Sequence, residues 1–140
     1  MINYIRNRTR ELWAKEWQNR TDCRQTRAFI AKPQPKIWKD IKLQGNEKIG
    51  RVIRFLSGHG HMRRHSTLIK YDISGEEADN HEEAQCRLCL EHEETPIHLI
   101  TECDVLFHER LGIFGQGEIL AWLRDRPPDW SPALLEFINL

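Results

Sequence analysis

The sequence predicts an all-α fold built mainly from short helices and interrupted by one small hairpin. Apolar side chains recur at helical spacing in several segments, and prolines or glycines separate these segments. Runs of alternating apolar and polar residues, which would predict strands, are weak throughout. The 140 residues suffice for one modest domain or two small ones.

A long helix is expected first, over residues 3–19. Its apolar side chains Ile5 and Leu12 lie among charged residues, and Trp17 follows Trp13 by one turn. Tryptophans can stack on nucleic-acid bases, but at this helical spacing they more often belong to a core. We therefore expect both tryptophans in the core.

The next segments predict a polar stretch, a breaker and a second helix. Residues 21–27 are polar, and residues 31–35 contain two prolines, which remove donors and restrict the preceding residues. A short helix then fits residues 35–43. Its expected inward side chains are Ile37, Trp38 and Ile41.

Residues 47–57 show the clearest amphipathic pattern. Four apolar side chains occupy one helical face, with Asn46 as the expected N-cap and Gly58 at the end. Another short helix is expected over residues 62–71, whereas residues 74–85 are acidic and predict a loop or linker. The four apolar residues are Ile49, Val52, Ile53 and Leu56.

The last third of the chain predicts three helices. Thr95 is a suitable N-cap and Pro96 a suitable first residue for a helix over residues 96–111. A short helix over residues 118–124 follows two glycines, and Ser131-Pro132 begins the final one. The chain thus divides into a basic helical region (1–73), an acidic loop with a cysteine-rich module (74–112) and a C-terminal helical segment (113–140).

The zero net charge hides a marked asymmetry. Residues 1–70 contain 17 Lys/Arg and 5 Asp/Glu, a net charge of +12, and residues 71–140 contain 4 and 16, a net charge of −12. Such a division indicates an anionic partner for the first half. The alternative is that the two halves only attract each other. Because many basic residues lie on helices that look exposed, we favour the anionic partner.

Three cysteines and a histidine follow the pattern Cys86-x2-Cys89-x8-His98-x4-Cys103. Thiolate and imidazole are the usual donors of structural zinc, and a Cys-x2-Cys turn directs two thiolates at one ion. All four positions of a tetrahedral ion would be filled by protein, which indicates one structural Zn²⁺ in a hairpin-plus-helix module. Metal binding would also supply folding free energy to this small acidic segment.

The histidine ligand has alternatives nearby. His92 or His108 could replace His98, which is favoured because we expect it on the same helix as Cys103. A second metal site at His59, His61 and His65 lacks a cysteine or carboxylate at suitable spacing. We therefore expect these histidines to face solvent.

The sequence gives no positive case for an enzyme or a membrane protein. It has no Gly-rich phosphate loop and no nucleophile elbow, so we expect no catalytic residues. No apolar run approaches the roughly 18 residues of a membrane span, and the charged N-terminus lacks a secretory signal. We expect an intracellular protein, nuclear or cytoplasmic, with metal or free thiols rather than disulfides.

Several segments resemble the region downstream of RNase H at the C-terminus of jockey-like non-LTR retrotransposon reverse transcriptase polyproteins. That family has a helix ending in an LTGHG-like sequence, then a zinc motif C-x2-C…E-x-T-x-x-H-L-L-x-x-C. Here residues 53–60 (IRFLSGHG) match the first. The four proposed ligands, together with Glu93 or Glu94, Thr95 and Leu99, match the second. Upstream, several residues resemble the linker that follows RNase H in that family, namely Trp13, Trp17, Gln25–Arg27, Phe29 and Lys32-Pro33. The match therefore covers roughly residues 10–112.

The resemblance implies a non-catalytic accessory zinc domain, because the polymerase palm and the RNase H carboxylates are absent from this chain. It implies contact with template RNA or target DNA, with polymerase and RNase H domains as neighbours. We expect phosphate contacts, which are sequence-independent and salt-dependent, from the basic half. The candidate residues are Lys48, Arg51, Arg54, Arg63 and Arg64, with Arg24, Arg27 and Lys32 as a second group. The alternative is a structural or protein-interaction zinc domain whose C-terminal residues Trp122, Leu123, Leu134 and Phe137 pack on a partner or a neighbouring domain.

Overall fold

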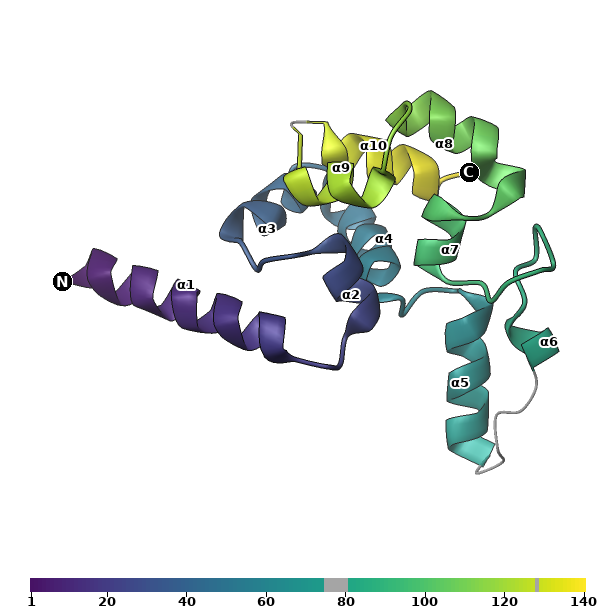
Figure 1. Ribbon diagram of the computed structural model, residues 1–140, viewed down its shortest axis with the longest axis horizontal. Helices are drawn as coiled ribbons and strands as arrows, with labels where there is room; N and C mark the ends of the chain where they lie inside the picture. The colour runs from purple at the N-terminus through teal and green to yellow at the C-terminus, as the bar shows by residue number, and fades with distance from the viewer. Residues whose placement is uncertain (75–80, 128) are drawn as a thin grey trace.

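The computed structural model describes residues 1–74, 81–127 and 129–140, and these are predominantly helical (Figure 1). One isolated antiparallel bridge joins Gln85 and Glu93 within this part. The all-α prediction is confirmed. The elements are α1 (Ile2–Asn19), α2 (Arg24–Phe29), α3 (Pro35–Lys42), α4 (Asn46–Ser57), α5 (Arg63–Ser74), α6 (His81–Ala84), α7 (Pro96–Thr101), the 3-10 helix η1 (Asp104–Leu106), α8 (Phe107–Phe114), α9 (Ile119–Asp125) and α10 (Trp130–Ile138).

One hydrophobic core joins the first and last parts of the chain. Helix α10 packs against α4 and α8, and α2 packs against α4 and α9. The Phe55 ring lies between those of Phe29 and Phe137, with centroid distances of 5.8 and 6.1 Å. Ile100 of α7 and Leu134 of α10 are fully buried in the same cluster. Helix α7 therefore connects the cysteine-rich loop to the core.

The C-terminal apolar residues serve this core. Leu123, Leu134 and Phe137 are buried by the chain itself, and Trp122 is partly buried against Phe114, with ring centroids 5.5 Å apart. In the alternative reading these side chains pack on a partner or a neighbouring domain; the three buried ones pack on other parts of the same chain and do not face a partner. Their helical spacing correctly indicated an apolar face that becomes buried. The spacing does not indicate whether the same chain or another protein covers that face.

Helix α2 was not predicted, since its residues look polar. Cys23 precedes it with a positive φ of 52°, and Phe29 at its end is 2% exposed. A helix of six residues is too short to be stable alone, and burial of this aromatic side chain supplies packing energy that stabilises it. The N-cap of α4 also differs from the prediction by one residue. Gly45 is the N-cap, and the predicted cap Asn46 is the first residue of the helix.

Helix α1 stands away from the remainder of the molecule in Figure 1 and buries no side chain. Trp13 is 54% exposed, so the prediction of a core position is wrong for it. Trp17 is partly buried, and its Nε1–H donates to the Ile30 carbonyl at 2.9 Å. Trp38 on α3, also expected inward, is 51% exposed.

The predicted acidic loop over residues 74–85 lies partly outside the described residues. Within the described part, residues 81–84 form the short α6, which packs beside α5. None of the described helices combines the length and the apolar character that crossing a membrane requires.

Candidate metal centre

The chain reverses direction around Cys86 and Cys89. The Cys86 N–H donates to the His92 carbonyl at 2.7 Å, the Leu90 N–H to the Cys86 carbonyl at 2.9 Å, and the Glu94 N–H to the Ala84 carbonyl at 2.8 Å. These bonds form the hairpin that the sequence predicted at the two cysteines. Leu90 closes the turn with a φ of 59°, a conformation that favours glycine.

Helix α7 supplies the histidine. Thr95 is its N-cap, as predicted, and its Oγ1 accepts a hydrogen bond from the His98 N–H at 3.0 Å. The helix ends after one and a half turns, because the N–H groups of Glu102 and Cys103 both donate to the His98 carbonyl, at 2.8 and 2.9 Å. The prediction of one helix over residues 96–111 is therefore wrong, and Cys103 lies between α7 and η1.

Arg110 of α8 explains why the chain can break there. Its side chain is buried and donates to the carbonyls of Leu99, at 3.2 Å, and Cys103. The last carbonyls of a helix need such partners when water cannot reach them. The buried guanidinium thus fixes the position of Cys103.

The four predicted ligands converge. The Sγ atoms of Cys86, Cys89 and Cys103 and a ring nitrogen of His98 all lie within 4.8 Å of one another. Cys86 Sγ is 4.0 Å from Cys103 Sγ, and Cys89 Sγ is 3.3 Å from His98 Nε2. Tetrahedral ligands about 2.0–2.3 Å from an ion lie about 3.3–3.8 Å apart, so the spacing is close to that of a metal site. These residues could hold one metal ion.

The thiols differ in their titration. Burial raises the pKa of the Cys103 thiol to about 11, and the neighbouring charge of Cys86 adds to the effect. Burial also acts to raise the pKa of Cys89, but hydrogen bonds from the backbone of Glu91 and His92, with those of Cys86 and Cys103, outweigh it and lower this pKa. Cys89 therefore becomes a thiolate, the form that binds metals, more readily than Cys103.

His98 is buried at 3% exposure, and its Nδ1 has no hydrogen-bond partner among the described residues. The nearest carboxylate is that of Glu102, whose Oε2 lies 3.5 Å from Nδ1 at an angle that does not make a hydrogen bond. Ligating histidines usually donate from their second nitrogen to such a group, which fixes the tautomer. Glu102 is suitably placed for that role after a small rotation.

The alternative histidines do not join this group. His92 is exposed, and its ring lies against that of His98 with centroids 5.4 Å apart. His108 is exposed on α8 beside Phe107. Among the described residues, the histidine that completes the cysteine cluster is His98.

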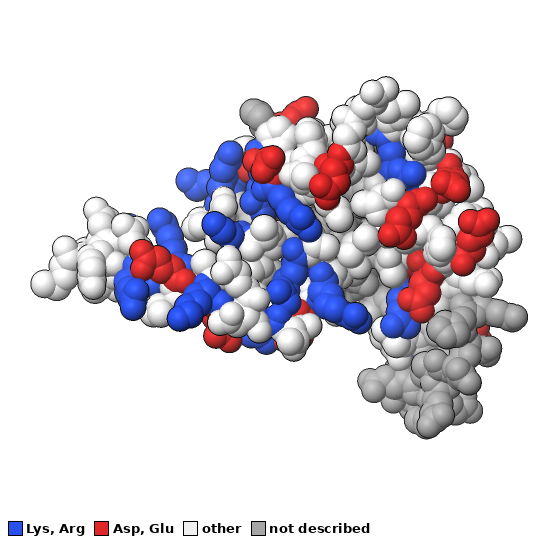
Figure 2. Space-filling model, in the orientation of Figure 1, with Lys and Arg blue, Asp and Glu red and all other residues white. Residues whose placement is uncertain are grey.

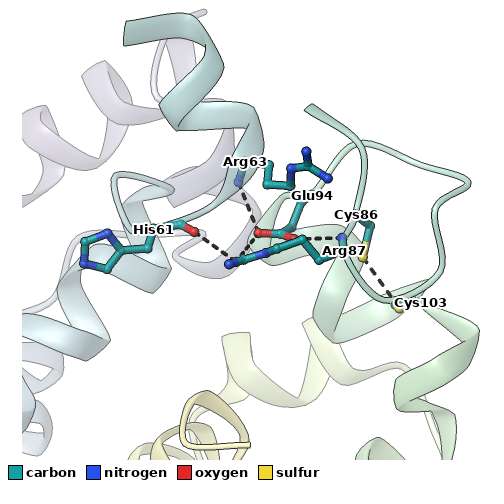
Figure 3. A network of polar contacts seen from close by, with 6 residues as sticks. All are labelled: His61, Arg63, Cys86, Arg87, Glu94 and Cys103. Carbon is teal, nitrogen blue, oxygen red and sulfur yellow. Dashed lines mark hydrogen bonds and ion pairs between the residues drawn. The ribbon is translucent and has the colours of Figure 1, made fainter. Parts of the chain in front are cut away.

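An ion pair that was not predicted from the sequence, between exposed Arg87 and buried Glu94, fixes the loop to the rest of the molecule (Figure 3). Glu94 is 2% exposed, and its carboxylate accepts hydrogen bonds from the Arg87 side chain at 2.6 and 2.9 Å. It also accepts from the backbone N–H groups of Arg87, at 3.0 Å, and Arg63, at 3.1 Å. Arg87 reaches further, to the His61 carbonyl at 3.1 Å.

The network crosses from the hairpin to the junction of α4 and α5. Burial alone would raise the pKa of Glu94, but the Arg87 guanidinium and the two backbone donors outweigh it and hold this pKa below its usual range. The carboxylate therefore stays ionised although it is almost completely shielded from solvent. Local sequence gives no signal for this pair, since both residues belong to an acidic, polar run.

The eight predicted phosphate contacts divide into three sets. Arg51 donates to Asn139 Oδ1 at 2.7 Å, Arg64 pairs with Glu93 at 3.1 Å, and Arg27 donates to backbone carbonyls at the α1–α2 junction. The side chains of these three already have partners within the chain. Arg54 is exposed but donates to the Gly50 carbonyl, and Arg63 is partly buried. The remaining three, Arg24, Lys32 and Lys48, are exposed.

Comparison of the chain with family models, with curated proteins and with solved structures finds no match. The resemblance to retrotransposon polyproteins therefore stays a prediction.

Proposed function

We propose that this chain is a non-catalytic domain that binds one structural zinc ion and contacts RNA or DNA through its basic N-terminal half. The observation that carries the proposal is the convergence of Cys86, Cys89, His98 and Cys103. Three thiolates and an imidazole are a typical zinc set, and they leave no open position for a catalytic water. Burial of three of the four ligands supports a structural role.

The charge distribution supports the nucleic-acid part. In Figure 2 basic side chains predominate over the side that carries α1, α2 and α3, with some acidic ones among them, and acidic side chains predominate over the side of α7 and α8. Phosphate binding needs such a basic surface, with the acidic side turned away. Exposed Trp38 lies on α3 between Lys36 and Lys39, where a nucleic-acid base could stack on it.

Metal content is the first test. The purified protein should contain one zinc ion per chain, and Cys86→Ser or Cys103→Ser should reduce this content strongly. Cys23→Ser is the matched control, because Cys23 is exposed and lies outside the cluster. A wild-type protein that stays folded and binds no zinc would refute the metal part of the proposal.

Nucleic-acid binding is tested separately, with zinc-loaded protein, a single-stranded RNA and a DNA duplex over a salt series. Reversing Arg24, Lys32 and Lys48 to Glu should weaken binding and flatten the salt dependence by about 0.9 per lost duplex contact. Trp38→Ala should weaken single-strand binding about tenfold. Leu43→Ala, which changes an 81% exposed apolar residue next to α3, should not.

The second candidate is a structural or protein-interaction zinc domain that does not bind nucleic acid. The exposed apolar residues of α1 favour it, since these side chains contact nothing within the chain that would bury them. Folded, zinc-loaded protein that binds neither RNA nor DNA at low salt would select this candidate.

A further inference from the structure

Helix α1 presents an apolar stripe that its own chain leaves uncovered. Ile2, Ile5, Leu12 and Trp13 are between 53 and 68% exposed, and their spacing places them on one face of the helix. The helix has 18 residues and is attached to the body at its C-terminal end by the Trp17–Ile30 hydrogen bond. Basic side chains flank the stripe, namely Arg6, Arg8, Arg10 and Lys15, and Arg8 also pairs with Glu11 at 3.3 Å. Glu16 lies on the face of the stripe near the end of the helix.

An isolated helix of this length is only marginally stable in water, and most helices in proteins depend on packing of their apolar face. The stripe is therefore incomplete without a second surface. That surface should be apolar along its centre and acidic at its edges, to complement the flanking arginines and lysine.

The chain itself carries a surface of this kind. A groove of about 360 Å³ lies beside α8, lined by Phe107, Leu111 and Ile119 together with Gly115 and Gly117. Phe107 is 53% exposed, and no atom lies within 4 Å of where a side chain would start at either glycine, so the groove is open. Its polar lining consists of Thr101, Arg110 and Gln116. Acidic residues lie outside the lining, exposed on η1, on α8 and at the N-cap of α9, namely Asp104, Glu109 and Glu118.

The two surfaces lie at opposite ends of the molecule, so α1 does not cover the groove of its own chain (Figure 1). We propose that α1 of one chain docks into the α8 groove of a second copy, and that two chains exchange this contact reciprocally. Closed two-fold pairs are the commonest symmetric assemblies. The halves of +12 and −12 within a neutral chain attract in this arrangement without overall repulsion.

A second copy explains more than other occupants do. An anionic membrane would accept a basic amphipathic helix, but it would leave the groove with its acidic neighbours uncovered. Pairing of α1 with α1 would bring like charges together. The reciprocal contact covers the stripe and the groove at once and matches their charges.

The test is the molar mass of zinc-loaded wild-type protein by sedimentation equilibrium. We expect a dimer at low salt that dissociates as salt rises. The double variants Leu12→Glu/Trp13→Glu and Phe107→Glu/Leu111→Glu should each be monomeric with unchanged zinc content and helicity, because the substituted side chains are exposed. Tyr4→Glu, at a 74% exposed position off the stripe, and Leu43→Glu are matched controls that should stay dimeric.

Mixing the two monomeric variants identifies the contact. In a mixed pair, the intact α1 of one variant meets the intact groove of the other, so a weaker dimer should reappear. The proposal is overturned if wild-type protein is monomeric, if only the α1 variant loses the dimer, or if the mixture stays monomeric. Vesicles of anionic lipid that bind monomeric wild type through α1 would equally overturn it.

Discussion

The cysteine-rich loop and helix α1 show opposite relations between regularity and burial. The loop, residues 85–103, has one isolated bridge and one short helix, yet Cys86, Cys103, Glu94 and His98 within it are at most 3% exposed. Helix α1 is regular over 18 residues and buries none of them. Order in the loop depends on converging polar side chains, whereas the order of α1 depends mainly on its own backbone hydrogen bonds, with side-chain hydrogen bonds to the body at its C-terminal end. Substitutions in the two regions should therefore differ greatly in effect.

Metal removal should have the largest effect. Zinc contributes about 10–16 kcal/mol to the folding of small zinc modules at neutral pH. Helix α7 carries both His98 and the core residue Ile100, so loss of the ion should loosen the core as well as the loop. A chelator should lower Tm and expose the amides of residues 85–103 to hydrogen exchange, while those of α1 change little. An unchanged exchange pattern would show that the ion does not order the loop.

Breaking the Arg87–Glu94 ion pair ranks second. Arg87→Ala removes the countercharge of the buried Glu94 carboxylate, but the Arg87 side chain is 60% exposed and two backbone N–H groups still donate to Glu94. We therefore expect a loss of about 1–2 kcal/mol in the free energy of unfolding. The matched control is Arg20→Ala, which removes an exposed pair with Asp22 and should change stability little. Urea unfolding of the zinc-loaded proteins measures both. A small loss for Arg87→Ala would show that Glu94 is solvated or neutral.

The same pair sets a pH dependence. The pKa of Glu94 lies below its ordinary value of 4.5, so its ionised form stabilises the fold above that pH and the stabilisation disappears as pH falls through the lowered pKa. Without the Arg87 guanidinium, burial raises the pKa of Glu94 with less opposition. The stabilisation by the ionised carboxylate should then begin to disappear at a higher pH. Comparing each protein with its Glu94→Gln counterpart at equal pH separates this effect from acid release of the metal.

Leu90→Gly should stabilise the protein slightly. Leu90 is 62% exposed and has a φ of 59°, which strains a residue with a side chain by about 1–2 kcal/mol. Glycine removes the strain but has more conformational freedom in the unfolded chain. The free energy of unfolding should therefore increase by only about 0.5–1 kcal/mol. Leu88→Gly, at a 47% exposed position without a positive φ, should instead destabilise. Equal effects of the two substitutions would contradict the assigned strain.

The sequence predicted what depends on nearby residues. The Cys-x2-Cys turn, the Thr95 cap and the amphipathic α4 all follow from short spacings, and the four candidate ligands do converge. The end of α7 was missed because it depends on Arg110, which caps its carbonyls from α8. The Glu94–Arg87 pair and the exposure of Trp13 were missed for a related reason. A local pattern shows which residues of a segment are apolar or charged. Segments far away in the sequence determine which other residues these side chains contact.

Trp17→Phe should have a moderate effect on the attachment of α1. The substitution keeps an aromatic ring but removes the Nε1–H that donates to the Ile30 carbonyl. A lost hydrogen bond in a partly buried position corresponds to about 1 kcal/mol. Limited proteolysis measures the result, since α1 should be cleaved faster while the rest of the chain stays resistant. Unchanged cleavage would mean that other contacts hold the helix.

The smallest effect should come from Trp13→Ala. Substituting a buried aromatic residue such as Phe29 by alanine destabilises by about 3–5 kcal/mol, because a core cavity forms. Trp13 is 54% exposed and opens no cavity, so we expect a change of less than about 0.5 kcal/mol at concentrations where the protein is monomeric. At concentrations where it is dimeric, the same substitution should lower Tm, since it removes part of the α1 contact with the second copy. A loss that does not depend on concentration would instead place Trp13 against its own chain.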